Sequence, residues 1–157
     1  LSAPRIYIFA KGESYLAGCI FRNNLLKLDR HVTMADDGGL QTLHVKNGRP
    51  GDLFLFLSYS GIHYDYSKYA AALSERGIKP CLITAFSDSA LARQCDTVLL
   101  IPKSERVIGK VANYSSMVSL TYTLQVIYSL IFNQDYQENY RVKHEADSFI
   151  FTSFAEI

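Results

Sequence analysis

The sequence predicts an α/β fold in which helices cover both faces of a five-stranded parallel sheet, a three-layer αβα sandwich. One apolar run without a polar break, residues 53–57, is typical of a strand buried on both faces. The helical spacing of Tyr66, Ala70 and Leu73 predicts a helix directly after it, which Gly77 ends. Such strand–helix units recur along the chain, and successive units of this kind pair in parallel through right-handed crossovers.

The expected elements alternate along the chain. Strands are expected at residues 5–10, 31–35, 53–57, 80–85 and 97–101. Helices are expected at residues 14–28, 40–45, 66–76, 89–94, 113–133 and 135–145, with an apolar tail at 149–154. Ser14 is expected to cap the first of these helices. Five strands joined in this way favour a doubly wound sheet with flavodoxin-like strand order.

Length and composition place the whole chain, residues 1–157, in a single domain. The formal net charge of +1 gives no general attraction to nucleic acid or to acidic lipid. Cys19, Cys81 and Cys95 include no CxxC pair, which favours reduced, buried thiols in a cytoplasmic protein. Asp36 and Asp37 have no third ligand at a suitable spacing, so we expect a turn there and no metal site.

One long apolar segment, residues 114–132, needs a separate explanation. Serine, threonine and glutamine interrupt it throughout, so we expect no bilayer span and no membrane partner. Its apolar residues surround the helix axis, which is typical of a helix buried all round. One face of a small sheet cannot cover such a helix, so the sequence predicts a homodimer built partly on it, with the apolar tail lying on the partner.

Residues 58–63, with the sequence SYSGIH, carry the strongest functional signal. They join the carboxyl end of a buried strand to the start of a helix, where α/β proteins bind ligands and where free N–H groups favour an anion. The hydroxyls of Ser58 and Ser60 are donors for phosphate oxygens, and Gly61 lets the backbone approach closely. The same residues are also compatible with a plain strand-to-helix turn that has a serine cap.

The chain resembles the SIS (sugar isomerase) domain family over about residues 5–140. The resemblance rests on the segments RIYIFAKGESYLAG, LFLFLSYSG and AAALSERGIKPCLITAFSDSALARQCDTVLLIP. The closing segment VANYSSMVSLTYTLQVIYSLIFNQDYQENY is similar to the end of SIS domains in RpiR-type bacterial transcription regulators. In those regulators a helix-turn-helix domain precedes the SIS domain. The chain has no initiating methionine and enters a strand almost at once, so we expect it to be a piece of a longer protein.

The resemblance implies a phosphosugar ligand and no cofactor. Ser58 and Ser60 match the family's phosphate-binding hydroxyls, with Tyr59 and Gly61 in the same loop. Ser14 matches the serine of the first loop, which also faces the ligand. His63 stands where the family has Thr or Ser, so phosphate binding is expected to survive, to become pH-dependent or to be lost.

Two further residues have alternative interpretations. Glu105 follows the last expected strand, where RpiR-type domains have a glutamate, and is expected either to accept hydrogen bonds from sugar hydroxyls or to be a solvated loop carboxylate. Lys11 is a candidate phosphate partner or simply an exposed turn residue. The catalytic E-x-x-H-G segment of SIS isomerases is missing from the sequence, so we expect His63 to contact ligand or pack in the loop, and we expect no catalytic residue.

These observations favour an effector-sensing, phosphosugar-binding and dimerisation domain of an RpiR-type bacterial transcription regulator of sugar metabolism. DNA would be bound only through a separate N-terminal domain. A phosphosugar isomerase of the same fold is the first alternative. An interaction module with a vestigial pocket is the second, and a flavodoxin-like mononucleotide protein is the third.

Overall fold

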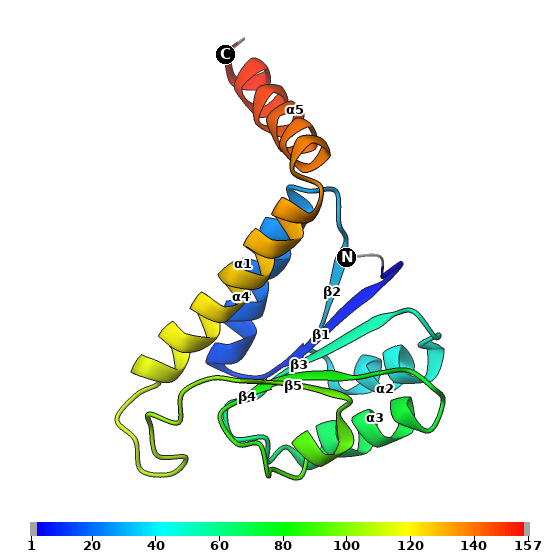
Figure 1. The fold of residues 1–157 in the computed structure, drawn as a ribbon, viewed down its shortest axis with the longest axis vertical. Helices are drawn as coiled ribbons and strands as arrows, with labels where there is room; N and C mark the ends of the chain where they lie inside the picture. Colours follow the sequence, from blue (N-terminus) through cyan, green and yellow to red (C-terminus); the bar gives the residue numbers. More distant parts are fainter. Residues whose placement is uncertain (1–2, 156–157) are drawn as a thin grey trace.

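The computed structural model contains one parallel sheet with the strand order β2-β1-β3-β4-β5 (Figure 1). The strands are β1 (Ile6–Ala10), β2 (Val32–Ala35), β3 (Leu53–Leu57), β4 (Cys81–Thr84) and β5 (Thr97–Leu100). The structure describes residues 3–155, without the side chains of residues 150 and 152–155. The predicted α/β class and flavodoxin-like order are therefore confirmed, and each strand lies within one residue of its expected bounds.

The helices follow the expected alternation. They are α1 (Glu13–Leu26), α2 (Gly38–Asn47), α3 (Tyr64–Ser74), α4 (Tyr114–Gln134) and α5 (Tyr136–Ala155), with a short 3-10 helix, η1 (Ala92–Gln94). The predicted capping role of Ser14 is wrong, because Gly12 occupies the N-cap position and Ser14 lies inside the first turn. The expected break before residue 149 is also wrong: no glycine or proline follows Gln134, and α5 continues to Ala155.

The two faces of the sheet carry different side chains. On one face aliphatic residues such as Ile8, Leu57 and Ile83 pack against α1 and α4. On the other face aromatic residues such as Phe9 and Phe56 pack against α2 and α3. These side chains are almost fully buried, and burying each stabilises the fold by about 1.5–3 kcal/mol. The period-two alternation along each strand thus produces the three layers of Figure 1.

Helix α4 lies beside α1 across the aliphatic face of the sheet (Figure 1). Leu120 and Leu124 enter the core, and Asn24 donates a hydrogen bond from Nδ2 to Gln125 Oε1 at 3.0 Å. Among the described residues α4 alone is long and apolar enough to cross a membrane, with a mean hydropathy of 1.3. The core helix of a soluble protein passes the same criteria, so this is weak evidence for a span.

Helix α5 continues beyond α4 and extends away from the sheet (Figure 1). The chain bends at Asp135, where α4 ends. Asn139 fixes this bend: its buried side-chain amide donates hydrogen bonds to the carbonyl oxygens of Ile131 and Phe132, at 3.1 and 3.0 Å. Two of the orphan carbonyls at the end of α4 are therefore satisfied by a residue of α5.

The three cysteines are free and only partly buried. Burial raises the pKa of Cys95 to about 12 and also raises the pKa of Cys81. Neither of these two thiols is an activated nucleophile, since the thiolate form is disfavoured.

Candidate functional site

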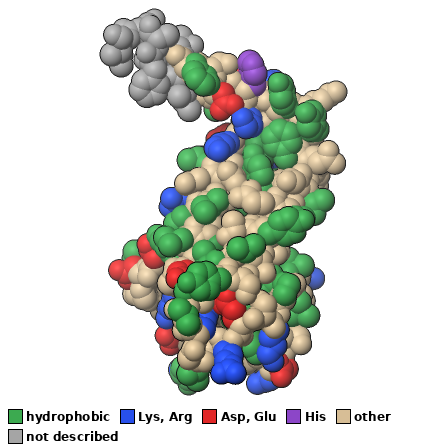
Figure 2. All heavy atoms as spheres, turned by 90° about the vertical axis from the view of Figure 1, so that its left-hand side faces the viewer, with side chains coloured by type: hydrophobic (Ala, Val, Ile, Leu, Met, Phe, Trp, Pro, Cys, Tyr) green, Lys and Arg blue, Asp and Glu red, His purple; other side chains and the backbone are tan. Residues whose placement is uncertain are grey.

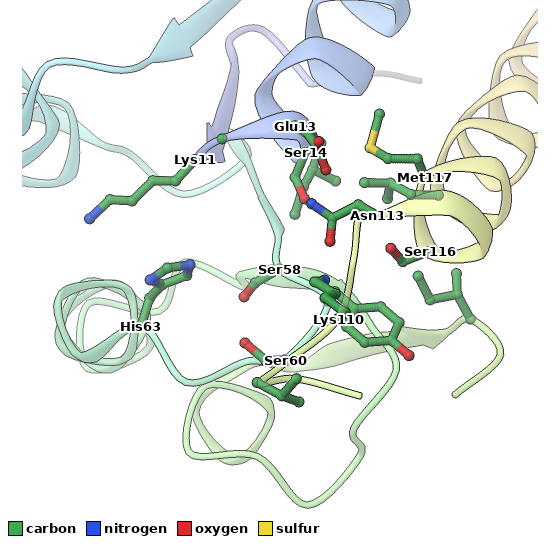
Figure 3. Close-up of a pocket in the computed structure, with 16 residues that line it drawn as sticks. Lys11, Glu13, Ser14, Ser58, Ser60, His63, Lys110, Asn113, Ser116 and Met117 are labelled. Atoms are coloured by element: carbon green, nitrogen blue, oxygen red, sulfur yellow. The ribbon is translucent and has the colours of Figure 1, made fainter. Parts of the chain in front are cut away.

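A cavity of about 180 Å³ opens at the carboxyl ends of β1 and β3 (Figure 3). These strands are neighbours in the sheet, and the connections that follow them run to opposite sides of it. Crevices at such a switch point are the usual ligand sites of open α/β sheets. The first wall comes from residues 11–14 and the second from residues 57–60 and His63.

Hydrogen bonds join the loop after β3 to the end of β4. Ser58 is 2% exposed, and its hydroxyl accepts a hydrogen bond from the Gly61 N–H at 3.1 Å. The Tyr59 carbonyl accepts hydrogen bonds from Thr84 Oγ1 and from the Ala85 N–H. Because the Ser58 oxygen is the acceptor in this bond, its O–H can still donate a hydrogen bond to a ligand. Figure 3 shows the Ser58 and Ser60 hydroxyls pointing toward one another at the edge of the cavity, with His63 on the same side.

Gly61 is required by the geometry of this loop. Its φ of 63° lies in the left-handed region, which side chains other than glycine adopt at a cost. A Cβ at this position would also collide with the side chain of Ser89. Gly61 therefore shapes the loop without itself lining the cavity, which distinguishes it from Ser58, Tyr59 and Ser60.

The starts of three helices meet at the cavity. Helix α1 begins after Gly12, α3 after His63 and α4 after Asn113, and none of these three N-cap residues makes a side-chain capping bond. The starts of α1 and α3 carry unsatisfied N–H groups and the positive ends of their helix dipoles, whereas at the start of α4 the Ser116 N–H already donates to the Glu105 carboxylate. Ser14 lies in the first turn of α1 and lines the cavity as expected. This arrangement favours a bound anion.

Two lysines add positive charge at different sides of the cavity (Figure 3). The Lys11 Nζ lies 4.0 Å from a carboxylate oxygen of Asp65 and 5.2 Å from the ring centre of Tyr66. The Lys110 Nζ lies 5.2 Å from the ring centre of Tyr59. Glu13 contributes a carboxylate to the lining, and Glu105 Oε2 lies 3.7 Å from the Lys110 Nζ, so nearby carboxylates partly balance the charge of the two lysines.

His63 packs against Tyr66, with ring centres 5.3 Å apart. Burial lowers the pKa of His63 below its usual value, and the nearby charge of Lys11 lowers it further. The imidazole is therefore neutral at pH 7 and offers one donor and one acceptor to the cavity.

Glu105, like Gly61 but unlike the other expected site residues, does not line the cavity. Its carboxylate accepts hydrogen bonds from the Ser115 hydroxyl at 2.9 Å, the Ser116 N–H at 3.0 Å and the Ser116 hydroxyl at 2.6 Å. The bonds from Ser116, and after them those from Ser115, lower the pKa of Glu105 to about 2. Glu105 thus takes the place of a cap at the start of α4.

The segment of residues 102–113, called the strap below, forms the third wall. Two hydrogen bonds join the strap to Tyr59. The Tyr59 hydroxyl accepts one from the Glu105 N–H at 2.8 Å and donates one to the Glu105 carbonyl at 2.9 Å. Sequence reasoning missed the polar cavity residues that the strap and α4 supply, Lys110, Asn113 and Ser116. Their only signal in the sequence is their position, since Lys110 and Asn113 lie between the last strand and α4 and Ser116 lies in the first turn of that helix.

The described residues hold no group of three or more His, Cys, Asp or Glu side chains that could bind a metal ion. The polar groups of the cavity are hydroxyls, amides, two ammonium groups, one imidazole and the carboxylate of Glu13. Together they can bind a compact, polar, anionic molecule by hydrogen bonds and charge.

Comparison with known proteins gives one family and several similar structures. The model of the SIS domain family matches residues 1–131. The glutamine–fructose-6-phosphate aminotransferase (isomerizing) of Listeria innocua is 28% identical over 130 residues, which cover 80% of this chain and 21% of that protein. The chain thus corresponds to about a fifth of the length of this relative.

Two solved structures illustrate the likeness of fold. The sugar isomerase domain of an RpiR transcription factor from Sphaerobacter thermophilus has a TM-score of 0.79 and 24% identity, covering 94% of this chain and 80% of that one. The Vibrio vulnificus NanR protein complexed with ManNAc-6P has a TM-score of 0.81 and 18% identity, covering 96% of this chain and 57% of that one.

Proposed function

The chain belongs to the SIS domain family, and from this premise we propose that it binds a sugar phosphate as the effector-sensing domain of an RpiR-type bacterial transcription regulator. One observation carries the proposal: Ser14, Ser58 and Ser60 lie around one cavity at which α1 and α3 begin without a side-chain cap. Hydroxyl donors and helix N-termini together suit a phosphate group. The remaining polar wall, with Asn113 and Ser116, supplies partners for sugar hydroxyls.

The regulator is favoured over an enzyme by what surrounds the cavity. Aldose–ketose isomerisation needs an acid or base that reaches the sugar carbons. The His144–Glu145 pair lies in α5, which extends away from the sheet (Figure 1). His63 and Glu13 remain as the titratable acid–base candidates of the lining, and no E-x-x-H-G segment accompanies them.

In this proposal the domain acts in the cytoplasm as a homodimer, and a separate N-terminal helix-turn-helix domain binds DNA. Effector binding can change the state of the regulator only if the effector prefers one dimer arrangement to another. The RpiR and NanR structures support this choice by their likeness of fold.

The alternative is a phosphosugar isomerase, which the isomerizing aminotransferase relative favours. Calorimetric titration with fructose 6-phosphate, N-acetylmannosamine 6-phosphate and ribose 5-phosphate tests binding, and the same mixtures tested for product test turnover. We expect saturable binding of at least one compound and no turnover of any. Turnover abolished by His63→Ala or Glu13→Gln would establish the isomerase instead.

A further inference from the structure

A second cavity opens beside the strap, with a volume of about 480 Å³. It lies between Phe86, in the connection that follows β4, and residues 103–107 of the strap, in the connection that follows β5. The parallel strands place both connections at the carboxyl edge of the sheet, where the first cavity also lies. Open α/β sheets bind their ligands at this edge, so the second cavity is positioned for a ligand.

The second cavity carries two exposed cationic side chains, Lys103 and Arg106. In the described part of the chain, no carboxylate forms an ion pair with either of them. The lining includes one carboxylate, that of Glu105, and the start of α4 engages it through three hydrogen bonds. Figure 2 shows Lys and Arg side chains gathered on the face that carries α4 and the strap, at the end opposite α5. The second cavity therefore favours an anion.

An apolar surface adjoins these charges. The Phe86 ring is half-buried, and the Lys103 Nζ lies 4.3 Å from its centre. Val107 is also half-buried and lines both cavities. A guanidinium and an ammonium bind phosphate or carboxylate groups, whereas an aromatic ring and a valine bind an apolar group. The chemistry of the cavity thus suits a molecule that has both parts.

We propose that the second cavity binds a small organic anion, in which a phosphate or a carboxylate is joined to an apolar group. Arg106 and Lys103 hold the charged group, and Phe86 and Val107 contact the apolar group. A sugar is a poor fit, because the one hydroxyl of the lining, that of Ser104, already donates its proton within the protein. The site thus goes beyond the proposed function and takes a ligand of a different class.

The two cavities share a wall. Tyr59 lines the first cavity, and its ring packs edge-on against Phe86 with the ring centres 5.7 Å apart. The Tyr59 hydroxyl is hydrogen-bonded to the backbone of Glu105 in the strap. The strap also supplies Val107 and Lys110 to the first cavity. A ligand in either cavity therefore contacts the same segment of the chain.

Amide chemical shifts followed by NMR during titration with phenyl phosphate locate the site. We expect saturable shifts at Phe86 and at residues 103–107, because this probe joins a phosphate to an apolar ring. Inorganic phosphate lacks the ring and benzyl alcohol lacks the charge, so each should bind at least about 5-fold more weakly. Benzoate tests a carboxylate in the same way, and the tighter of the two anions identifies the charged group. The proposal fails if neither anion binds, if the shifts are confined to residues 11–14 and 58–63, or if inorganic phosphate binds equally well.

Charge-neutral variants test the two cations. Arg106→Gln and Lys103→Gln should each weaken binding of phenyl phosphate about 5-fold, as loss of one exposed ion pair does. Lys79→Gln is the matched control, because it removes an exposed lysine that precedes β4, at the opposite edge of the sheet. Unchanged affinity of either variant, or equal weakening by the control, contradicts the assignment.

A further variant separates this site from the proposed function. Ser60 lines the first cavity and not the second, so Ser60→Ala should leave the shifts at residues 103–107 unchanged. Loss of those shifts in Ser60→Ala would assign the bound phosphate to the first cavity and overturn the inference. No measurement here uses a sugar phosphate, so failure of the proposed effector is distinguishable from failure of the second site.

Discussion

Glu105 Oε2 accepts a hydrogen bond of 2.6 Å from the Ser116 hydroxyl and so ties the strap to the first turn of α4. The bond joins a residue of the third wall to a residue of α4. Because Ser116 lines the cavity and Glu105 does not, the carboxylate acts on the ligand site through its hold on α4.

The first prediction concerns this bond. Glu105→Gln should lower the stability of the domain at neutral pH, because a neutral amide accepts weaker hydrogen bonds than a carboxylate does. The pKa of Glu105 is lowered from 4.5 to about 2, so its contribution is present above about pH 4.5 and is lost as pH falls toward 2. The difference in Tm between the two proteins should therefore shrink over that range.

Thermal unfolding at a series of pH values measures this difference. Glu75→Gln, at the exposed C-cap of α3, is the control and should have a Tm close to that of the unmodified protein. A Glu105→Gln difference that stays constant down to pH 2 would contradict the assigned role.

The second prediction concerns Ser60. Ser60→Ala should weaken binding of a sugar phosphate about 10-fold to 150-fold, because a hydrogen bond to a charged group contributes roughly 1.5–3 kcal/mol. Calorimetric titration measures the change. Ser74→Ala, an exposed serine on α3, should bind as the unmodified protein does. Equal affinity of the Ser60 variant and the unmodified protein would place the phosphate elsewhere.

The third prediction separates two effects at Gly61. Gly61→Ala and Gly77→Ala both place a side chain at positive φ, with φ values of 63° and 71°. Each should lose about 1–2 kcal/mol of stability for that reason. A Cβ at Gly77 has open space, whereas one at Gly61 collides with Ser89. Urea unfolding should therefore show a larger loss for Gly61→Ala, and titration should show that it alone loses ligand binding.

The fourth prediction concerns the pH dependence of binding through His63. Burial and the Lys11 charge lower the pKa of the free imidazole, and a bound phosphate would raise it, with Asp65 as the nearby carboxylate. Binding then takes up a proton, so affinity should rise as pH falls from about 7.5 to about 5.5. His63→Gln keeps a donor and an acceptor but cannot be protonated in this range.

Titration of both proteins over the same pH range isolates the imidazole. The phosphate group itself titrates with a pKa of about 6, but this contribution is common to both proteins. The ratio of the two affinities should therefore change with pH. Parallel affinity curves would show that His63 stays neutral in the complex.

The sequence by itself determined the architecture and the two walls of the pocket that follow β1 and β3. Apolar runs such as residues 53–57 and helical spacing after them are local patterns, and parallel strand–helix units admit few topologies. The local pattern pointed to Ser58 and Ser60, and the resemblance to SIS domains added Ser14. The structure shows why they meet: they follow the neighbouring strands β1 and β3, whose carboxyl ends lie at one edge of the sheet.

The tertiary structure alone decided the rest of the pocket and the orientation of α4. Lys110 and Asn113 enter the cavity because Tyr59 holds the strap across it, a contact between residues 46 positions apart in the chain. The periodicity of α4 could not show whether Tyr122 or Val126 faces outward, because a helix that is apolar all round carries no preferred side. Packing of Leu120 and Leu124 into the core sets that rotation and leaves Tyr122 70% exposed and Val126 40% exposed.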